Sequence, residues 1–290
     1  MRIPNFFIVG MPRSGTTSLY TYLKQHPQIF LSLYKEPLFF CKDLDHRPYS
    51  VTSEEVYYSL FEGAEDYPVK GEGSVWYLTS EVAARAIHKV SPQARIVVML
   101  RDPLQMIQSL HSLYLRTGNE DIQDFASALA AQEERGAGQR LPDRCYFTNG
   151  LLYMEVARYY FKLKRFYDVF DAERIHVITF EHFAADPLAE CREVFRFLEI
   201  DPDAPIELNL GAAKRIIRPQ VMEQIRRAHP EVKAKLSRKL GKTHLGARRK
   251  PLDKMLERKL RRMLAEDLQR TGHLTGLDFS SWGPAANGRD

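Results

Sequence analysis

The sequence predicts an α/β fold in which a P-loop-type parallel sheet is flanked by helices and followed by a helical C-terminal portion. Short apolar runs alternate with amphipathic helical segments, as a parallel sheet with crossover helices requires. The run at 95–100 is apolar on every residue after Arg95, which is typical of a strand buried on both faces. The first run leads into a glycine-spaced turn that opens a helix.

The chain has 290 residues, of which 44% are hydrophobic, and can therefore bury a large core. We expect a single domain over 1–290, with a helical elaboration at about 219–282. The apolar stretch at 6–11 is much shorter than the roughly 20 residues of a membrane helix, so no transmembrane segment is expected.

Apolar runs bounded by turn signals predict strands, and apolar spacing of 3.6 residues between caps and prolines predicts helices. The expected strands are 6–9, 68–72, 95–100 and 174–179. The expected helices are 16–25, one beginning at Ser53, 79–90, 103–115, 151–170 and 187–198, followed after Pro219 by helices broken at Pro230, Gly241 and Pro251.

The turn after the first strand predicts an anion site. Gly10 and Gly15 occupy the glycine positions of the phosphate-binding pattern G-x-x-x-x-G-K-[ST], but Thr16 stands where that pattern has lysine. Arg13 supplies a cation inside the turn, and the helix that follows adds free N–H groups and roughly half a positive charge. Three hydroxyl side chains open this helix: Thr16, Thr17 and Ser18. The alternative is a turn that only joins a strand to a helix.

A second anion site is predicted where the strand at 95–100 ends, because open α/β sheets bind ligands at the carboxyl ends of their strands. Arg101 and Asp102 follow this strand, and Pro103 suits the first turn of the next helix. Ser109 lies about two turns into that helix. Arginine and hydroxyl could grip one phosphate, or Arg101 and Asp102 could form a local ion pair at a simple strand exit.

Charge is unevenly distributed along the chain. The net charge is +5, and basic residues predominate between Lys214 and Arg262. A polyanionic ligand, nucleic acid, an anionic membrane or plain solvation of helix faces would each explain this. Aromatic residues are nearly absent there, so the stacking platforms of single-strand binders are missing and no nucleic-acid partner is expected. Peripheral membrane contact stays open.

The three cysteines, Cys41, Cys145 and Cys191, are scattered and lack metal-ligand spacing. They predict neither a zinc site nor a disulfide framework, and a cytoplasmic location fits them best.

Two anion motifs in this order, together with the segment Lys35-Glu36-Pro37-Leu38-Phe39-Phe40, resemble sulfotransferases that use 3′-phosphoadenosine 5′-phosphosulfate (PAPS). The similarity is to bacterial members and the heparan-sulfate sulfotransferase branch, and it runs along nearly the whole chain. Arg101 and Ser109 match the family's signature for the 3′-phosphate. The family's 5′-phosphosulfate loop is matched by Pro12, Arg13, Ser14, Gly15, Thr16 and Thr17.

The resemblance implies PAPS as co-substrate, 3′-phosphoadenosine 5′-phosphate (PAP) as product, and no metal. Arg13 stands where many members have a catalytic lysine, and Glu36 matches the catalytic glutamate of the heparan-sulfate branch. Lys35 either binds the leaving phosphate or pairs with Glu36. Arg248, within 246–249, matches the basic loop that closes over the nucleotide. Competing candidates for that loop are Lys214, Arg215 and Arg218.

The chain departs from the heparan-sulfate pattern at two positions. Leu38 replaces a histidine, and Gly73 replaces the lysine of a Glu-Lys-Thr-Pro segment, which argues against a glycosaminoglycan acceptor. Glu72 is a second candidate base, or a buried partner of Lys70 or Arg13. Two aromatic residues could line the acceptor pocket or belong to the core: Trp76 and Tyr153.

The sequence thus predicts a sulfotransferase that moves a sulfuryl group from PAPS to a hydroxyl or amine. The acceptor is expected to be a small molecule, lipid, glycan or carrier-bound intermediate. The glycine-spaced turn leaves a P-loop nucleotide kinase as an alternative, although its lysine is absent. The basic C-terminal region leaves a non-catalytic polyanion-binding protein.

Overall fold

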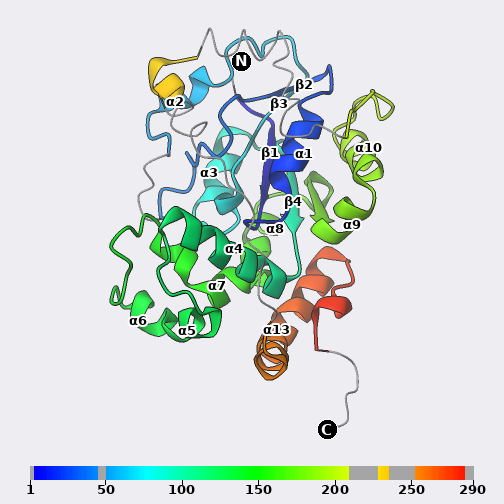
Figure 1. Cartoon of the computed structure of the whole chain (residues 1–290). Helices are drawn as coiled ribbons and strands as arrows, with labels where there is room; N and C mark the ends of the chain where they lie inside the picture. The colour runs from blue at the N-terminus through cyan, green and yellow to red at the C-terminus, as the bar shows by residue number, and fades with distance from the viewer. Residues whose placement is uncertain (1–2, 45–49, 209–227, 235–251, 285–290) are drawn as a thin grey trace.

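The computed structural model describes residues 3–44, 50–208, 228–234 and 252–284. At its centre lies a parallel sheet of five strands in the order β2-β3-β1-β4-β5 (Figure 1). The strands are β1 (Phe6–Gly10), β2 (Ile29–Leu31), β3 (Val69–Gly73), β4 (Arg95–Leu100) and β5 (Ile175–Thr179). The chain after β1 leads to one side of the sheet, and the chain after β3 crosses to the other. The carboxyl ends of β1 and β4 therefore border the crevice where open sheets bind ligands.

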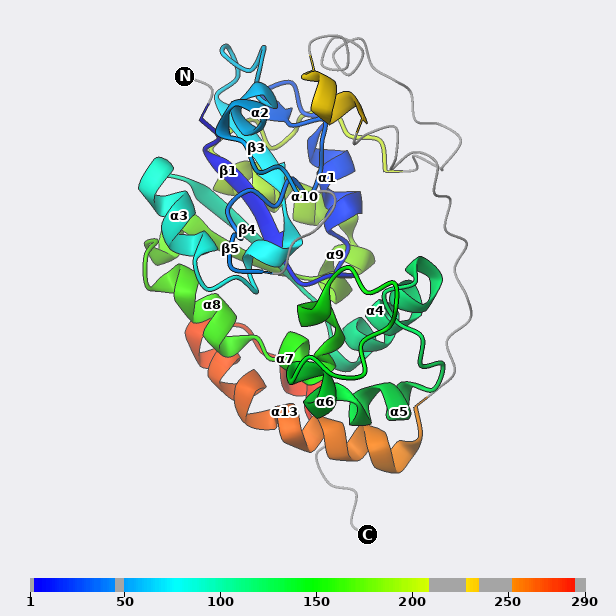
Figure 2. The same ribbon diagram turned by 90° about the vertical axis from the view of Figure 1, so that its left-hand side faces the viewer.

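Helices cover both faces of the sheet, and a long C-terminal helix lies across one end (Figures 1 and 2). The helices are α1 (Thr16–Leu23), α2 (Glu54–Ser59), α3 (Ala83–Val90), α4 (Pro103–Thr117), α5 (Phe125–Ala130), α6 (Gln132–Gly136), α7 (Tyr153–Ala157), α8 (Tyr160–Tyr167), α9 (Phe180–Ala185), α10 (Pro187–Phe197) and α13 (Lys254–Thr275). Short 3-10 turns are η1 (Val75–Tyr77), η2 (Thr148–Leu151), η3 (Ala172–Arg174) and η4 (Ser280–Trp282). The predicted fold class is confirmed.

The central strands are apolar on both faces because each face meets a helical layer. Phe7 and Val9 of β1 face a core shared with α3, α4, α8 and α13. Phe6 and Ile8 face a second core, shared with α1, α9 and α10. Alternate residues of one strand thus serve opposite cores, which explains the uninterrupted apolar run.

Gly10 is required by the sheet. It pairs with Met99 of β4, and a Cβ atom there would lie 2.2 Å from the Met99 carbonyl oxygen. Its φ of 145° is also one that residues with a side chain rarely adopt. Close packing of β1 on β4, rather than approach to a ligand, therefore explains this glycine.

The expected helix over 151–170 is wrong in one respect, because two helices occupy this range. The backbone at Arg158 is extended between α7 and α8. Asp267 of α13 accepts hydrogen bonds from the amides of Tyr159 and Tyr160, and Lys162 donates to the carbonyls of Glu155 and Arg158. These side chains satisfy the backbone groups that a helix break exposes, so the break depends on contacts that local spacing does not reveal.

Other boundaries differ by smaller amounts. The helix expected over 79–90 begins at Ala83, and Ser80 Oγ accepts from the amides of Val82 and Ala83 just before and at its start. The sequence reading missed β2, a three-residue strand, as well as α5, α6 and α9. The single-domain assignment stays a prediction, since 209–227 and 235–251 lie outside the described residues.

We expect Gly10→Ala to lower the free energy of unfolding by about 3 kcal/mol or more, because the new methyl group would force β1 away from β4. Gly138→Ala is the matched control, since its φ is 77° but a Cβ there would meet nothing within 4 Å. The control should lose only about 1 kcal/mol. Urea unfolding of the three proteins measures the difference, and equal losses would contradict the steric explanation.

Candidate active site

The turn between β1 and α1 presents positive charge to its surroundings. Arg13 and Gly15 adopt left-handed conformations, with φ values of 66° and 87°. Gly15 precedes the first residue of α1, and no acidic residue lies in the first turn of this helix. Pro12, Ser14 and Thr16 are buried, whereas Arg13, Thr17 and Ser18 are exposed. The positive end of the helix dipole is therefore not neutralised by a carboxylate from the first turn of the helix itself.

The two predicted anion motifs are in direct contact. The Arg13 Nε atom donates to Ser109 Oγ at 3.0 Å, and the Arg101 guanidinium donates to the Arg13 carbonyl oxygen at 3.0 Å. Arg101 also lies over the ring of Phe180, 4.3 Å from its centroid. The turn after β1 and the start of α4 thus form one surface, although the residues that meet are 96 positions apart.

Asp102 fixes the start of α4. Its carboxylate accepts from the amides of Leu104 and Gln105, as an N-cap does. Arg261 of α13 lies 3.2 Å from the same carboxylate. Asp102 therefore forms its ion pair with Arg261 and not with its neighbour Arg101. Arg101 instead faces the turn after β1.

Lys35 and Glu36 connect a second segment to this surface. The Lys35 ammonium lies 2.7 Å from Glu36 Oε1 and 3.3 Å from Thr16 Oγ1. The other Glu36 oxygen accepts from the Val75 amide at 3.0 Å. Both side chains remain partly exposed, at 18% and 25%. Lys35 thus brings an ammonium group to the helix start where the phosphate-binding pattern has its own lysine.

Glu72, the second candidate base, is completely buried. It accepts hydrogen bonds from Ser74 Oγ at 2.8 Å and from the Tyr57 hydroxyl at 3.3 Å. These partners replace the predicted Lys70 and Arg13. Burial raises its pKa to about 7, an effect that the hydrogen bonds oppose and the negative charge of Glu36 reinforces. With no exposed surface, Glu72 is poorly placed to meet an acceptor.

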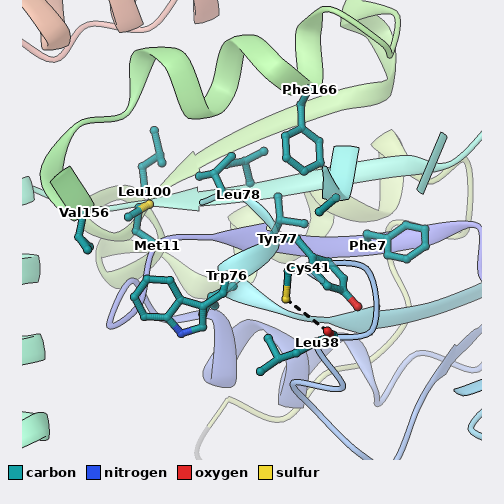
Figure 3. Packing of buried hydrophobic residues seen from close by; sticks show 14 of the residues in the cluster. Phe7, Met11, Leu38, Cys41, Trp76, Tyr77, Leu78, Leu100, Val156 and Phe166 are labelled. Carbon is teal, nitrogen blue, oxygen red and sulfur yellow. Dashed lines mark hydrogen bonds between the residues drawn. The ribbon is translucent and has the colours of Figure 1, made fainter. Parts of the chain in front are cut away.

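The aromatic candidates for an acceptor pocket lie in the core. Trp76 is 5% exposed and lies among buried core residues (Figure 3), and its ring packs edge-on against that of Phe147. The Tyr153 hydroxyl donates to Glu120, which forms a bidentate ion pair with the fully buried Arg135. Both aromatic residues therefore belong to the core.

The remaining expectations concern the basic loop near the C-terminus, a metal site and a membrane helix. Arg248 and the rest of 246–249 lie outside the described residues, and so do Lys214, Arg215 and Arg218. Within the described ranges, no group of three or more His, Cys, Asp or Glu side chains could hold a metal ion. Helices in the same ranges are too short or too polar to cross a bilayer.

The residues at the start of α1 fit an anionic group. Ser14 Oγ is buried there without a hydrogen-bond partner, although buried hydroxyls are normally satisfied. Arg13, Lys35 and Arg101 supply three cations around the same turn. Oxygen atoms of a phosphate or sulfate would accept from this hydroxyl and from the free amides of the helix.

The Sulfotransferase domain family matches residues 4–272, which include every element of the sheet and α1 to α10. This chain belongs to the sulfotransferase family. A crystal structure of a sulfotransferase from Alicyclobacillus acidocaldarius superposes with a TM-score of 0.76 at 28% identity. The match covers 96% of this chain and 98% of that one.

Curated relatives include carbohydrate sulfotransferase 15 of Mus musculus, 25% identical over 254 residues. The bifunctional heparan sulfate N-deacetylase/N-sulfotransferase of Drosophila melanogaster is 23% identical over 222 residues. Each alignment covers 69% of this sulfotransferase-family chain. The chain spans only 44% and 20%, respectively, of the length of these relatives.

The sequence reading did not identify Ser74, Val75 and Tyr57 as residues that order the site. Val75 contributes only a backbone amide, which no residue type indicates. Tyr57 lies on α2 and reaches Glu72 from another layer. Ser74 could have been found from the sequence, because a hydroxyl two residues after a glutamate at a strand end can hydrogen-bond to that glutamate.

The buried carboxyl of Glu72 should make stability depend on pH. Because its folded pKa of about 7 lies above the ordinary value of 4.5, the folded chain holds a proton that the unfolded chain releases. The free energy of unfolding of the parent should therefore fall, relative to that of Glu72→Gln, by about 2 to 3 kcal/mol from pH 5 to pH 8. Urea unfolding at the two pH values measures this change, and a constant difference would show that Glu72 is ionised throughout.

Proposed function

We propose that this chain transfers a sulfuryl group from PAPS to a hydroxyl or amine group of an acceptor. One observation supports this most strongly: the Arg13 side chain contacts Ser109 while Arg101 contacts the Arg13 backbone. Cations and a helix N-terminus are thereby gathered within reach of a single doubly phosphorylated adenosine. Membership of the sulfotransferase family gives the anion site its chemistry.

The reaction is an in-line displacement in which the acceptor oxygen or nitrogen forms a bond to sulfur. The bond from sulfur to the oxygen of the 5′-phosphate breaks, and PAP leaves with the negative charge. Arg13, Lys35 and the amides of α1 stabilise that charge as it develops. An arginine is always protonated, so Arg13 acts by charge and hydrogen bonding rather than as a proton donor.

Glu36 takes the proton from the attacking group. Its carboxylate is held at both oxygens, by Lys35 and by the Val75 amide, and is one-quarter exposed. A base must be fixed in direction and still be reached by the acceptor, and Glu36 meets both conditions. Glu72 is buried and meets only the first.

The acceptor is a small molecule, lipid, glycan or carrier-bound intermediate that carries a hydroxyl or amine. Near the base, Leu38 and Gly73 provide no charge for an acidic polysaccharide. A cytoplasmic location and the absence of a nucleic-acid partner remain predictions from composition. Peripheral contact with a membrane is compatible with the basic C-terminal segment.

We expect Glu36→Gln to lower kcat by about 10²- to 10⁴-fold, because the base is lost. Its affinity for PAP should stay at the parent level. Arg13→Ala should lower both transfer and PAP affinity, the latter by about 10-fold or more, because a charge-assisted contact disappears. Transfer from radiolabelled PAPS and calorimetry with PAP measure the two effects.

Glu55→Gln, an exposed change on α2, is the matched control and should behave as the parent. Parental transfer by Glu36→Gln would contradict the assignment of the base. Magnesium-dependent binding of ATP, without binding of PAP, would instead favour the nucleotide kinase.

A further inference from the structure

The segment that carries the proposed base has a strained backbone. Glu36 and Leu38, on either side of Pro37, have φ values of 66° and 57°. Residues with side chains rarely adopt this left-handed region and stay there only when their surroundings impose it. The conformation that aims Glu36 toward Lys35 and Val75 must therefore be held by contacts from outside the segment.

Backbone amides of this segment are held by the end of β3 and by η1. Glu36 N donates to a carbonyl oxygen, and the next amides donate to side-chain hydroxyls. The Cys41 thiol also donates to the Leu38 carbonyl oxygen at 3.3 Å, close to the ring of Tyr77 (Figure 3). The amide contacts are Glu36 N to Gly73 O (2.8 Å), Leu38 N to Ser74 Oγ (3.2 Å), and Phe39 N and Phe40 N to the Tyr77 hydroxyl (3.0 and 3.4 Å).

The Ser74 hydroxyl depends on Glu72 for its orientation. Ser74 Oγ donates to Glu72 Oε2 at 2.8 Å, and the negative charge of the same carboxyl group acts on the nearby Tyr77 hydroxyl. A hydroxyl has one proton to donate, so donation to the carboxylate leaves its oxygen free to accept from a backbone amide. Glu72 thus sets the direction of the hydrogen bond that reaches Leu38.

We propose that Glu72 is a positioning residue for the base: through Ser74 it holds residues 36–40 in the conformation that directs Glu36 toward the start of α1. The inference depends on the proposed function for the role of Glu36, but the restraint on the segment is a property of the fold. Glu72 touches neither substrate nor acceptor, and its effect on transfer is indirect.

Amide hydrogen exchange of a peptide covering residues 35–41, measured at pH 8 where the Glu72 carboxyl is ionised, tests this restraint. Glu72→Gln has one acceptor oxygen in place of two and adds an NH₂ donor, so at least one hydroxyl must turn. Ser74→Ala deletes the hydroxyl that holds Leu38 N. We expect exchange within this peptide to rise about 10-fold or more in both variants, because an amide that loses its partner opens more often.

Tyr57→Phe is the matched control. It also removes a hydrogen bond from Glu72, but its ring keeps its stacking on Phe39 and its hydroxyl contacts no amide of residues 36–40 in the described structure. Exchange and transfer should stay at the parent level in this variant.

The same proteins are then assayed for transfer. Glu72→Gln and Ser74→Ala should lower kcat by roughly 10- to 100-fold, as expected for a displaced catalytic group, while KM for PAPS stays unchanged. If Glu72 and Ser74 had a purely structural role, the substitutions would leave kcat unchanged or would change both kcat and KM for PAPS. If Glu72→Gln does not unfold cooperatively, it is not properly folded, and the exchange and kcat of Ser74→Ala alone test the proposal.

The proposal would be overturned if amides of residues 35–41 exchanged at the parent rate in both Glu72→Gln and Ser74→Ala. It would also be overturned if these amides exchanged faster while kcat stayed unchanged. If the parent transferred no sulfate from PAPS, the proposed function would fail. The exchange rates would still establish whether Glu72 holds the segment, so the two failures are distinguishable.

Discussion

The close contact between β1 and β4 is the constraint on which the rest of the site depends. Gly10 lets the two backbones approach at the end of β1, where any side chain would collide with the Met99 carbonyl. The turn after β1 and the helix after β4 consequently emerge side by side. Arg13 can then reach Ser109, and Arg101 can reach the turn. A wider separation of these strands would break both contacts.

Glu36 and Glu72 show how the surroundings of a carboxyl group determine its chemical role. Glu36 is partly exposed and ion-paired with Lys35, whereas Glu72 is enclosed by hydroxyl groups in the core, and burial raises its pKa. Similar side chains in different surroundings can therefore serve as a base and as a support for that base. The negative charge of each also bears on the other, because Glu36 contributes to the raised pKa of Glu72.

Gly73 stands where the heparan-sulfate pattern has a lysine, and the structure explains why a small residue fits here. A Cβ atom at this position would lie 3.0 Å from the ring of Tyr20, so a larger side chain requires a shift of that ring. The Gly73 carbonyl oxygen meanwhile accepts from the Glu36 amide. In this member of the family, β3 contributes backbone and buried hydrogen bonds to the site, while Lys35 and Arg13 contribute the cations.

Local patterns in the sequence determined the type of most elements: apolar runs specified the strands, and caps and prolines delimited α4 and α10. They also placed Arg13 in the turn between β1 and α1, Arg101 at the end of β4 and Ser109 on α4. Tertiary structure alone decided that Arg13 meets Ser109, that Glu72 is buried among hydroxyls, and that α7 and α8 are separate helices. These features depend on partners far away in the chain, such as Asp267, whose contribution is set by how layers pack rather than by neighbouring residues.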